Sequence, residues 1–162
     1  MMDIVVSFFS GVFGAVVGGL CTWHVTTRVE RNKARLETLL RAAEALQDYK
    51  VDYANWYVEY LSPLVEAKGH WERPSTGSPD PEKLRLMSAA DKGRGRLKVV
   101  HGALFAHFPK DVVKPLCTEI MKIILMTCYQ AQVDCREVDR VADGASDLIP
   151  DLIRKYASSR AW

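Results

Sequence analysis

The sequence predicts an all-α protein, in which one N-terminal transmembrane helix continues into an up-down bundle of about four helices. Two patterns predict this class: a stretch without charged residues, Ile4 to Thr27, and a helical spacing of apolar residues through most of the remaining chain. No segment alternates apolar and polar residues in the manner of half-buried strands. We therefore divide the 162 residues into an anchor over 1–27 and a helical bundle over 28–162.

The uncharged stretch is long enough to cross a bilayer. As a helix its 24 residues extend about 36 Å, whereas a hydrocarbon core measures about 30 Å. Eleven of them are Ile, Val, Phe or Leu, which favour insertion by roughly 3–7 kcal/mol before the polar residues offset part of this gain. A cleaved signal peptide is disfavoured, because Asp3 and no basic residue precedes the stretch. A buried helix of a soluble protein remains the alternative.

Small residues recur at a spacing of four within this stretch. Gly14 and Gly18 form a G-x-x-x-G pair, and a second series contains Gly11, Ala15 and Gly19. Small residues allow two membrane helices to approach closely, so we expect this face to make the chain a homo-oligomer. The alternative is that glycine is common in membrane helices whether or not they associate.

Basic residues follow the uncharged stretch and none precedes it. Four of them lie within the first turns of the helix that follows Thr27: Arg28, Arg31, Lys33 and Arg35. The positive-inside rule then places the N-terminus outside the cell (inner) membrane and the C-terminal domain in the cytoplasm. The lipid bilayer is accordingly the first partner that the sequence predicts.

A long helix is expected to continue from the membrane without interruption, because residues 28–62 contain neither Gly nor Pro. Its apolar residues follow a heptad pattern over residues 36–64, typical either of a parallel coiled coil between chains or of the inner face of a bundle. Leu40 widens this stripe and favours the bundle. Tyr49 and Trp56 lie off the stripe and form a candidate partner surface, with core packing as the alternative for both rings.

The composition of residues 69–81, rich in Gly, Pro and Ser, predicts a flexible loop. Asp80 is expected to cap a helix over residues 81–108, with a proline in its first turn. Gly93 and Gly95 weaken this helix and mark the place where it would break.

A third helix is predicted over residues 112–142. Its segment 117–129 is apolar almost all round, so it should be the central buried helix. Gly144 is expected to end this region, and a last helix should follow with Pro150 near its start.

Charge and cysteine content exclude several classes of function. A net charge of +2 is too small for a protein that coats nucleic acid, so we expect no nucleic-acid partner. The cysteines have no paired short spacing and predict neither a disulfide framework nor a zinc site: Cys21, Cys117, Cys128 and Cys135. We expect no metal and no cofactor.

Basic residues also gather around the glycines of the second predicted helix. Arg94, Arg96 and Lys98 form a candidate partner surface there, with a solvated helix face as the alternative. Arg96 and His101 resemble, in their spacing, the Arg–His motif of HEPN-type helical-bundle ribonucleases. That resemblance implies that the arginine stabilises a phosphorane and the histidine moves a proton.

These patterns favour a protein that binds rather than catalyses. We expect a single-pass, membrane-anchored scaffold or regulatory protein that self-associates and docks a protein partner at the cytoplasmic membrane face. One alternative is a membrane-active effector, whose glycine-lined helices form a pore when the bundles cluster. A further alternative is a membrane-anchored ribonuclease of the HEPN type, with Arg96 and His101 as its catalytic pair.

Overall fold

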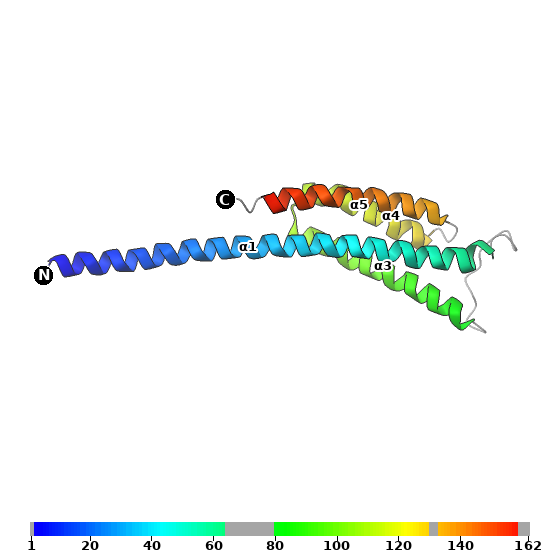
Figure 1. Ribbon diagram of the computed structural model, residues 1–162, viewed down its shortest axis with the longest axis horizontal. Coiled ribbons are helices and arrows are strands. Elements are labelled where there is room, and N and C mark those ends of the chain that lie inside the picture. The colour runs from blue at the N-terminus through cyan, green and yellow to red at the C-terminus, as the bar shows by residue number, and fades with distance from the viewer. Residues whose placement is uncertain (1, 64–79, 130–132, 159–162) are drawn as a thin grey trace.

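The computed structural model describes residues 2–63, 80–129 and 133–158, with side chains from residue 17 onward except at 60, 61, 128, 129 and 158. Within these residues the chain has four α-helices and no strand. The elements are α1 (Met2–Trp56), a short π-helix η1 (Tyr57–Leu61), α3 (Pro81–His107), α4 (Lys110–Tyr129) and α5 (Cys135–Ser158). Figure 1 shows the C-terminal half of α1 packed against the other helices, while its N-terminal half projects away from them.

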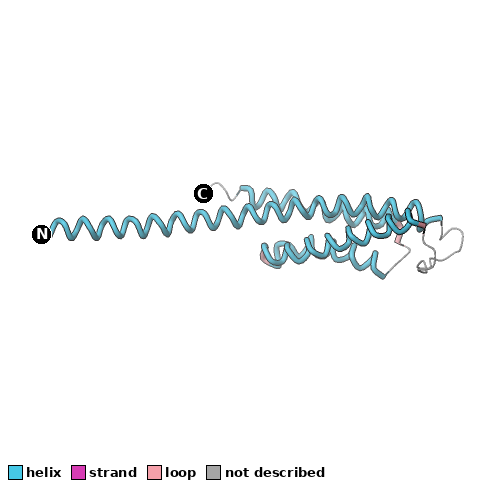
Figure 2. The backbone as a smooth tube through the Cα atoms, turned by 90° about the horizontal axis from the view of Figure 1, so that it is seen from below, coloured by secondary structure: helices cyan, strands magenta, loops and turns pink. Residues whose placement is uncertain are grey.

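The four helices form a bundle, which confirms that part of the predicted fold. Helix α1 packs against α3 and α5, and α4 packs against the same two neighbours. Successive helices run in opposite directions along the bundle, as Figures 1 and 2 both show. As a consequence, the end of α5 and the connection from α3 to α4 lie at the end of the bundle from which α1 projects.

The apolar stripe of α1 closes within one chain. Its buried leucines and tyrosines pack against side chains of the three other helices, among them Leu97 and Leu104 of α3, Leu116 and Ile120 of α4, and Val138 and Ile149 of α5. The expected widening of the stripe at Leu40 is wrong, since this side chain is 54% exposed. Burial extends instead toward Ala42 and Ala45, because α1 contacts two helices and these small residues let both come close.

Helix α3 begins where the sequence predicted it. A carboxylate oxygen of Asp80 accepts a hydrogen bond from the Glu82 backbone N–H at 3.0 Å, which satisfies one free donor at the start of the helix. The expected break at Gly93 and Gly95 is wrong, because α3 runs through both. Gly93 is buried against α1, and a Cβ built there would lie 2.9 Å from the ring of Tyr49.

The prediction of one helix over 112–142 is wrong. Helix α4 ends at Tyr129, and α5 begins at Cys135, where the carboxylate of Asp134 accepts a hydrogen bond from the Arg136 backbone N–H at 2.9 Å. The predicted start of the last helix after Gly144 is also wrong, since α5 continues through Gly144 and Pro150. Both residues are exposed, so the proline ring does not press against another helix. The missing proline N–H removes one backbone hydrogen bond within α5.

The predicted transmembrane stretch, residues 4–27, lies entirely within α1, which passes residue 28 without interruption. Among the described residues, no helix combines the length and the apolar character needed to cross a membrane. The side chains of residues 4–16, which supply most of the apolar character of the predicted span, lie outside the description. The predicted loop at 69–81 lies outside it as far as residue 79.

Candidate functional site

A groove lies between α1 and the end of α5, where α1 leaves the bundle. Its volume is about 430 Å³, within the range of roughly 300–1,000 Å³ that is typical of small-ligand sites. We call it the basic groove. Its lining comes from seven residues of α1 and two of α5: Trp23, His24, Thr27, Arg28, Arg31, Asn32, Arg35, Lys155 and Tyr156.

The helical repeat explains why so many α1 residues share this groove. Residues three and four apart lie on one side of a helix, so positions 24, 28, 31 and 35 form one row that faces α5. The last turn of α5 supplies the opposite wall with Lys155 and Tyr156. The groove therefore exists only when α5 is docked against α1.

Arg35 fastens this end of the bundle. Its Nε donates a hydrogen bond to the backbone oxygen of His107 at 2.8 Å, at the end of α3. Its guanidinium carbon lies 5.8 Å from the centre of the Phe108 ring and 5.0 Å from that of the Tyr156 ring, distances typical of cation–π contacts. The two rings meet edge to face, with centres 5.1 Å apart. One arginine thus joins α1 to the ends of α3 and α5.

The electrostatic character of the basic groove is positive. Three arginines and Lys155 line it, and no Asp or Glu of the described residues is among its lining. Arg28 and Arg31 have no ion-pair partner within the described part of the chain, whereas five basic residues elsewhere on the bundle each pair with a carboxylate three residues away. The carbonyl end of α5 opposes this field with a partial charge of about −0.5, which four full charges outweigh.

A second groove, of about 460 Å³, lies on the other side of Arg31 and Arg35. Arg31 and Arg35 line it together with Glu30, Ala34, Ala106 and His107. Because Glu30 contributes a negative charge, this groove is less basic than the first. Arg31 and Arg35 both line the two grooves, and Arg31 is the more exposed of the two.

A third groove, also of about 460 Å³, lies between α1 and the first half of α3. Its charges are mixed: Asp48 and Asp52 come from α1, and Arg85, Lys92 and Arg96 from α3. Arg96 and Asp48 form an ion pair at 2.9 Å across it. Since the charges largely balance, the third groove offers no strong field for a charged ligand.

The two candidate catalytic residues, Arg96 and His101, have separate surroundings. Arg96 pairs with Asp48 of α1, while the ring of His101 stands edge-on to Phe105 of its own helix, with centres 5.0 Å apart. Burial lowers the pKa of His101 and so favours its neutral form. Five residues on a helix correspond to about 500°, which places the two side chains on different faces. No contact brings them together, so no observation favours the ribonuclease hypothesis.

The candidate partner surface does not form one patch. Tyr49 is 1% exposed and belongs to the core, and Trp56 is half-buried with its ring centre 5.6 Å from that of Tyr53. Arg94 donates a hydrogen bond to the backbone oxygen of Thr127 at 3.0 Å and ties α3 to α4. Lys98 is exposed, and Arg96 has the ion pair described above. For Tyr49, core packing is therefore the correct alternative.

The predicted association face is described only in part. Gly11, Gly14 and Ala15 lie in α1 but outside the residues whose side chains are described. A Cβ built at Gly18 or Gly19 would meet no atom of the described residues within 4 Å, so no contact among them requires glycine at either position. The topology-determining residues Arg28, Lys33 and Arg31 are exposed on α1, beyond this face.

Thiols and metal ligands form no site in the described part of the chain. No group of three or more His, Cys, Asp and Glu side chains there lies close enough to hold a metal ion. Cys117 is buried, and burial raises the pKa of its thiol to about 11. Burial and the neighbouring Asp134 raise the pKa of Cys135, and Cys21 is exposed on α1.

Sequence reasoning identified the arginines of the basic groove but missed its other wall. Nothing in the sequence shows that Tyr156 of the last helix meets Arg35, 121 positions earlier. A contact of this kind depends on how the helices are arranged, and a local pattern does not contain that information. No family model, curated protein or solved structure matches this chain.

Proposed function

We propose that this chain is a single-pass, membrane-anchored helical scaffold or regulatory protein of the cell (inner) membrane. Residues 1–27 form its anchor, and residues 28–162 form a cytoplasmic bundle that docks a protein partner. The chain self-associates through the small-residue face of its anchor and acts by binding rather than by catalysis.

One observation carries this proposal: the N-terminal half of α1 projects from the bundle as a continuous helix (Figure 1), and large apolar side chains on it are exposed. Its large apolar side chains there are 43–68% exposed: Val17, Leu20, Trp23, Val25 and Val29. At 100° per residue these positions are spread around the helix and do not form a single face. Burying each would contribute about 1.5–3 kcal/mol, so a projecting helix of this kind favours an apolar surrounding.

The remaining parts of the proposal have separate support. The positive-inside rule and the exposed arginines after Thr27 support a cytoplasmic bundle. The open surroundings of Gly18 and Gly19 support helix association between chains, because their lack of a side chain serves no contact among the described residues.

Cysteine accessibility in intact cells tests the anchor and its orientation. The four native cysteines are replaced, and single cysteines are introduced as Met2→Cys or Thr76→Cys. We expect a membrane-impermeant maleimide to label position 2 and to leave position 76 unlabelled until lysis. Labelling at 76 alone would invert the topology. A protein that fractionates with the soluble phase, unlabelled at both positions until lysis, would end the proposal.

Disulfide cross-linking tests self-association, with Cys21 kept as the only cysteine. Oxidation of membranes should yield a cross-linked dimer, and the pair of changes Gly14→Leu and Gly18→Leu should strongly reduce it by separating the helices. Val17→Leu serves as the control, since it adds bulk next to the same face without filling it. Equal cross-linking in all three proteins would contradict association through this face.

A further inference from the structure

We propose that the basic groove binds the phosphate of an anionic phospholipid headgroup. This inference rests on the proposed membrane anchor and adds to it a defined lipid site, built jointly by α1 and α5. The juxtaposition that carries it is the row of arginines on α1 opposite Lys155, at the level where α1 leaves its uncharged stretch.

The depth of the arginines along α1 matches the headgroup layer. A hydrocarbon core of about 30 Å within a bilayer of roughly 40–45 Å leaves about 5–8 Å of headgroup on each side. Counted from Thr27 at about 1.5 Å per residue, Arg28 lies about 1.5 Å and Arg31 about 6 Å beyond the apolar stretch. Arg35 lies about 12 Å beyond it, outside this layer. Arg28 and Arg31 therefore stand at the height of the lipid phosphates.

The chemistry of the groove fits a phosphate. Guanidinium groups bind phosphate oxygens through two parallel hydrogen bonds, and an ammonium adds a point charge. Arg28 and Arg31 keep these donors available, since neither has an ion pair among the described residues. Lys155 faces them from α5, and no carboxylate among the described side chains lines the groove. A ligand with a net negative charge is therefore favoured over a zwitterionic one.

Trp23 accounts for the lipid part of the ligand, and Arg35 has a positioning role. Trp23 is 68% exposed at the membrane side of the groove, and indole rings are favoured at the boundary between acyl chains and headgroups. Arg35 is occupied by its contacts with His107 and the two rings, so we assign it as a positioning residue that holds Tyr156 and the end of α5 in place. A free phosphate ion would use the arginines but would gain nothing from Trp23.

This site differs from the general attraction of basic segments to acidic membranes. General attraction depends on the number of charges near the surface, at about 1 kcal/mol per basic residue, and does not require a folded bundle. A site made by α1 and α5 binds with a defined stoichiometry. It also loses affinity when Lys155 is changed, although this residue is more than a hundred positions from the anchor.

Native mass spectrometry of the full-length protein in a neutral detergent tests the proposal. The protein is titrated separately with phosphatidylglycerol, phosphatidylcholine and inorganic phosphate, and the mass of each complex identifies the ligand and its stoichiometry. We expect one phosphatidylglycerol to bind more tightly than the other ligands. Arg31→Gln and Lys155→Gln should each weaken this binding about fivefold, equivalent to about 1 kcal/mol per basic residue.

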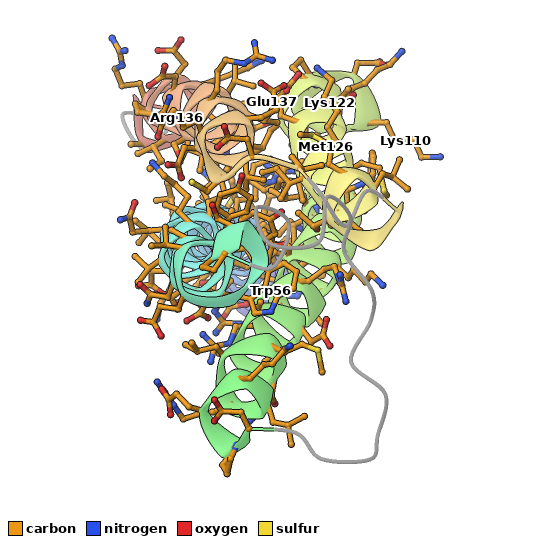
Figure 3. All side chains as sticks on the ribbon, turned by 90° about the vertical axis from the view of Figure 1, so that its right-hand side faces the viewer. Trp56, Lys110, Lys122, Met126, Arg136 and Glu137 are labelled. Atoms are coloured by element: carbon orange, nitrogen blue, oxygen red, sulfur yellow. The ribbon has the colours of Figure 1, made fainter. Side chains whose placement is uncertain are left out.

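The matched control is Arg136→Gln, at the opposite end of the bundle, which Figure 3 shows facing the viewer. It removes the same charge from an exposed position and should leave lipid binding unchanged. Equal weakening by Arg31→Gln and Arg136→Gln would overturn the site, as would phosphatidylcholine binding as tightly as phosphatidylglycerol. Inorganic phosphate binding as tightly as the lipid would overturn the lipid assignment. The labelling pattern in cells separates these outcomes from a failure of the anchor itself.

Discussion

Replacing Gly93 by alanine should destabilise the bundle, because α1 and α3 approach each other at this glycine. A Cβ there would lie 2.9 Å from Cδ2 of Tyr49, 3.4 Å from a carboxylate oxygen of Asp52 and 3.7 Å from the Tyr49 Cα. The first distance is shorter than any ordinary contact between carbon atoms. Either the Tyr49 ring or the axis of one helix must therefore move.

The surroundings of Tyr49 limit how far its ring can yield. The side chain is 1% exposed, and its ring centre lies 5.9 Å from that of Tyr53, which is itself buried. Overpacking in such a core costs about 1–3 kcal/mol. Alanine recovers about 1 kcal/mol of helix propensity relative to glycine, so the net loss of unfolding free energy at Gly93 should be about 0–2 kcal/mol.

Gly95 supplies the matched control on the same helix. No atom lies within 4 Å of a Cβ built at this position, so Gly95→Ala gains the helix propensity without the clash and should stabilise by about 0.5–1 kcal/mol. The propensity term cancels in the comparison, and the two variants should differ by about 1–3 kcal/mol. Urea unfolding of the full-length protein in a neutral detergent, followed by circular dichroism, measures this difference. A Gly93→Ala protein as stable as Gly95→Ala would refute the close packing of α1 on α3.

Three further predictions concern single side chains. Arg35→Lys keeps the charge but loses the hydrogen bond and ring contacts of the guanidinium, so it should lower the unfolding free energy by about 1–3 kcal/mol in urea unfolding. Arg31→Lys, at an exposed position, should change the unfolding free energy by no more than about 0.5 kcal/mol in the same assay. Equal effects of the two changes would contradict the role of Arg35 in joining the three helices. Tyr53→Phe removes the buried hydroxyl that donates to the Val133 backbone oxygen at 2.8 Å and should cost about 1–2 kcal/mol in the same assay, and an unchanged midpoint would contradict this bond. Burial of Cys117, which is 2% exposed, raises its pKa from 9.0 to about 11, so the unfolded chain releases this proton at a lower pH than the folded chain. The unfolding free energy should therefore fall above about pH 9, by about 1 kcal/mol at pH 10. Cys117→Ala should reduce the slope of unfolding free energy against pH between about pH 9 and 10, and an unaltered slope would exclude the thiol as its source.

The helices that sequence reasoning located correctly are those with chemical signals at their ends. Asp80 and Pro81 mark the start of α3, because a side-chain cap and a proline in the first turn are both local features. The uninterrupted run after residue 28 likewise belongs to α1. In these segments the residues that set the boundary are neighbours in the sequence, so the pattern contains the answer.

The boundary between α4 and α5 was misplaced because helix-breaking residues are absent from the connection and present inside α5. Residues 130–134 contain neither Gly nor Pro, whereas Gly144 and Pro150 lie inside α5. What keeps α5 continuous is its buried face, formed by Val138, Val141, Ala142, Ala145 and Ile149. Packing of this face against α1 and α4 outweighs the weak propensity of one exposed glycine and one exposed proline. The spacing of these residues was the signal that would have shown the helix to be continuous.

The candidate site was predictable only on the α1 side. Arg28, Arg31 and Arg35 are prominent in the sequence because they follow an uncharged stretch. Their division into two exposed cations and one that is tied to His107 and Tyr156 is a property of the folded bundle. Sequence alone treats the three arginines as equivalent, and the structure assigns Arg35 a different role.

The unbroken course of α1 has a mechanical consequence. A helix without a hinge transmits rotation along its whole length. Rotation of residues 2–27 about the axis of α1 must therefore also rotate Leu39 and Leu46, which are fixed in the core. One extra residue between the two parts would turn them relative to each other by about 100° and separate them by about 1.5 Å. The angular position of the glycine face is therefore set by the packing of the bundle. If two chains associate through this face, as proposed above, the packing of the bundle determines the direction in which each bundle points.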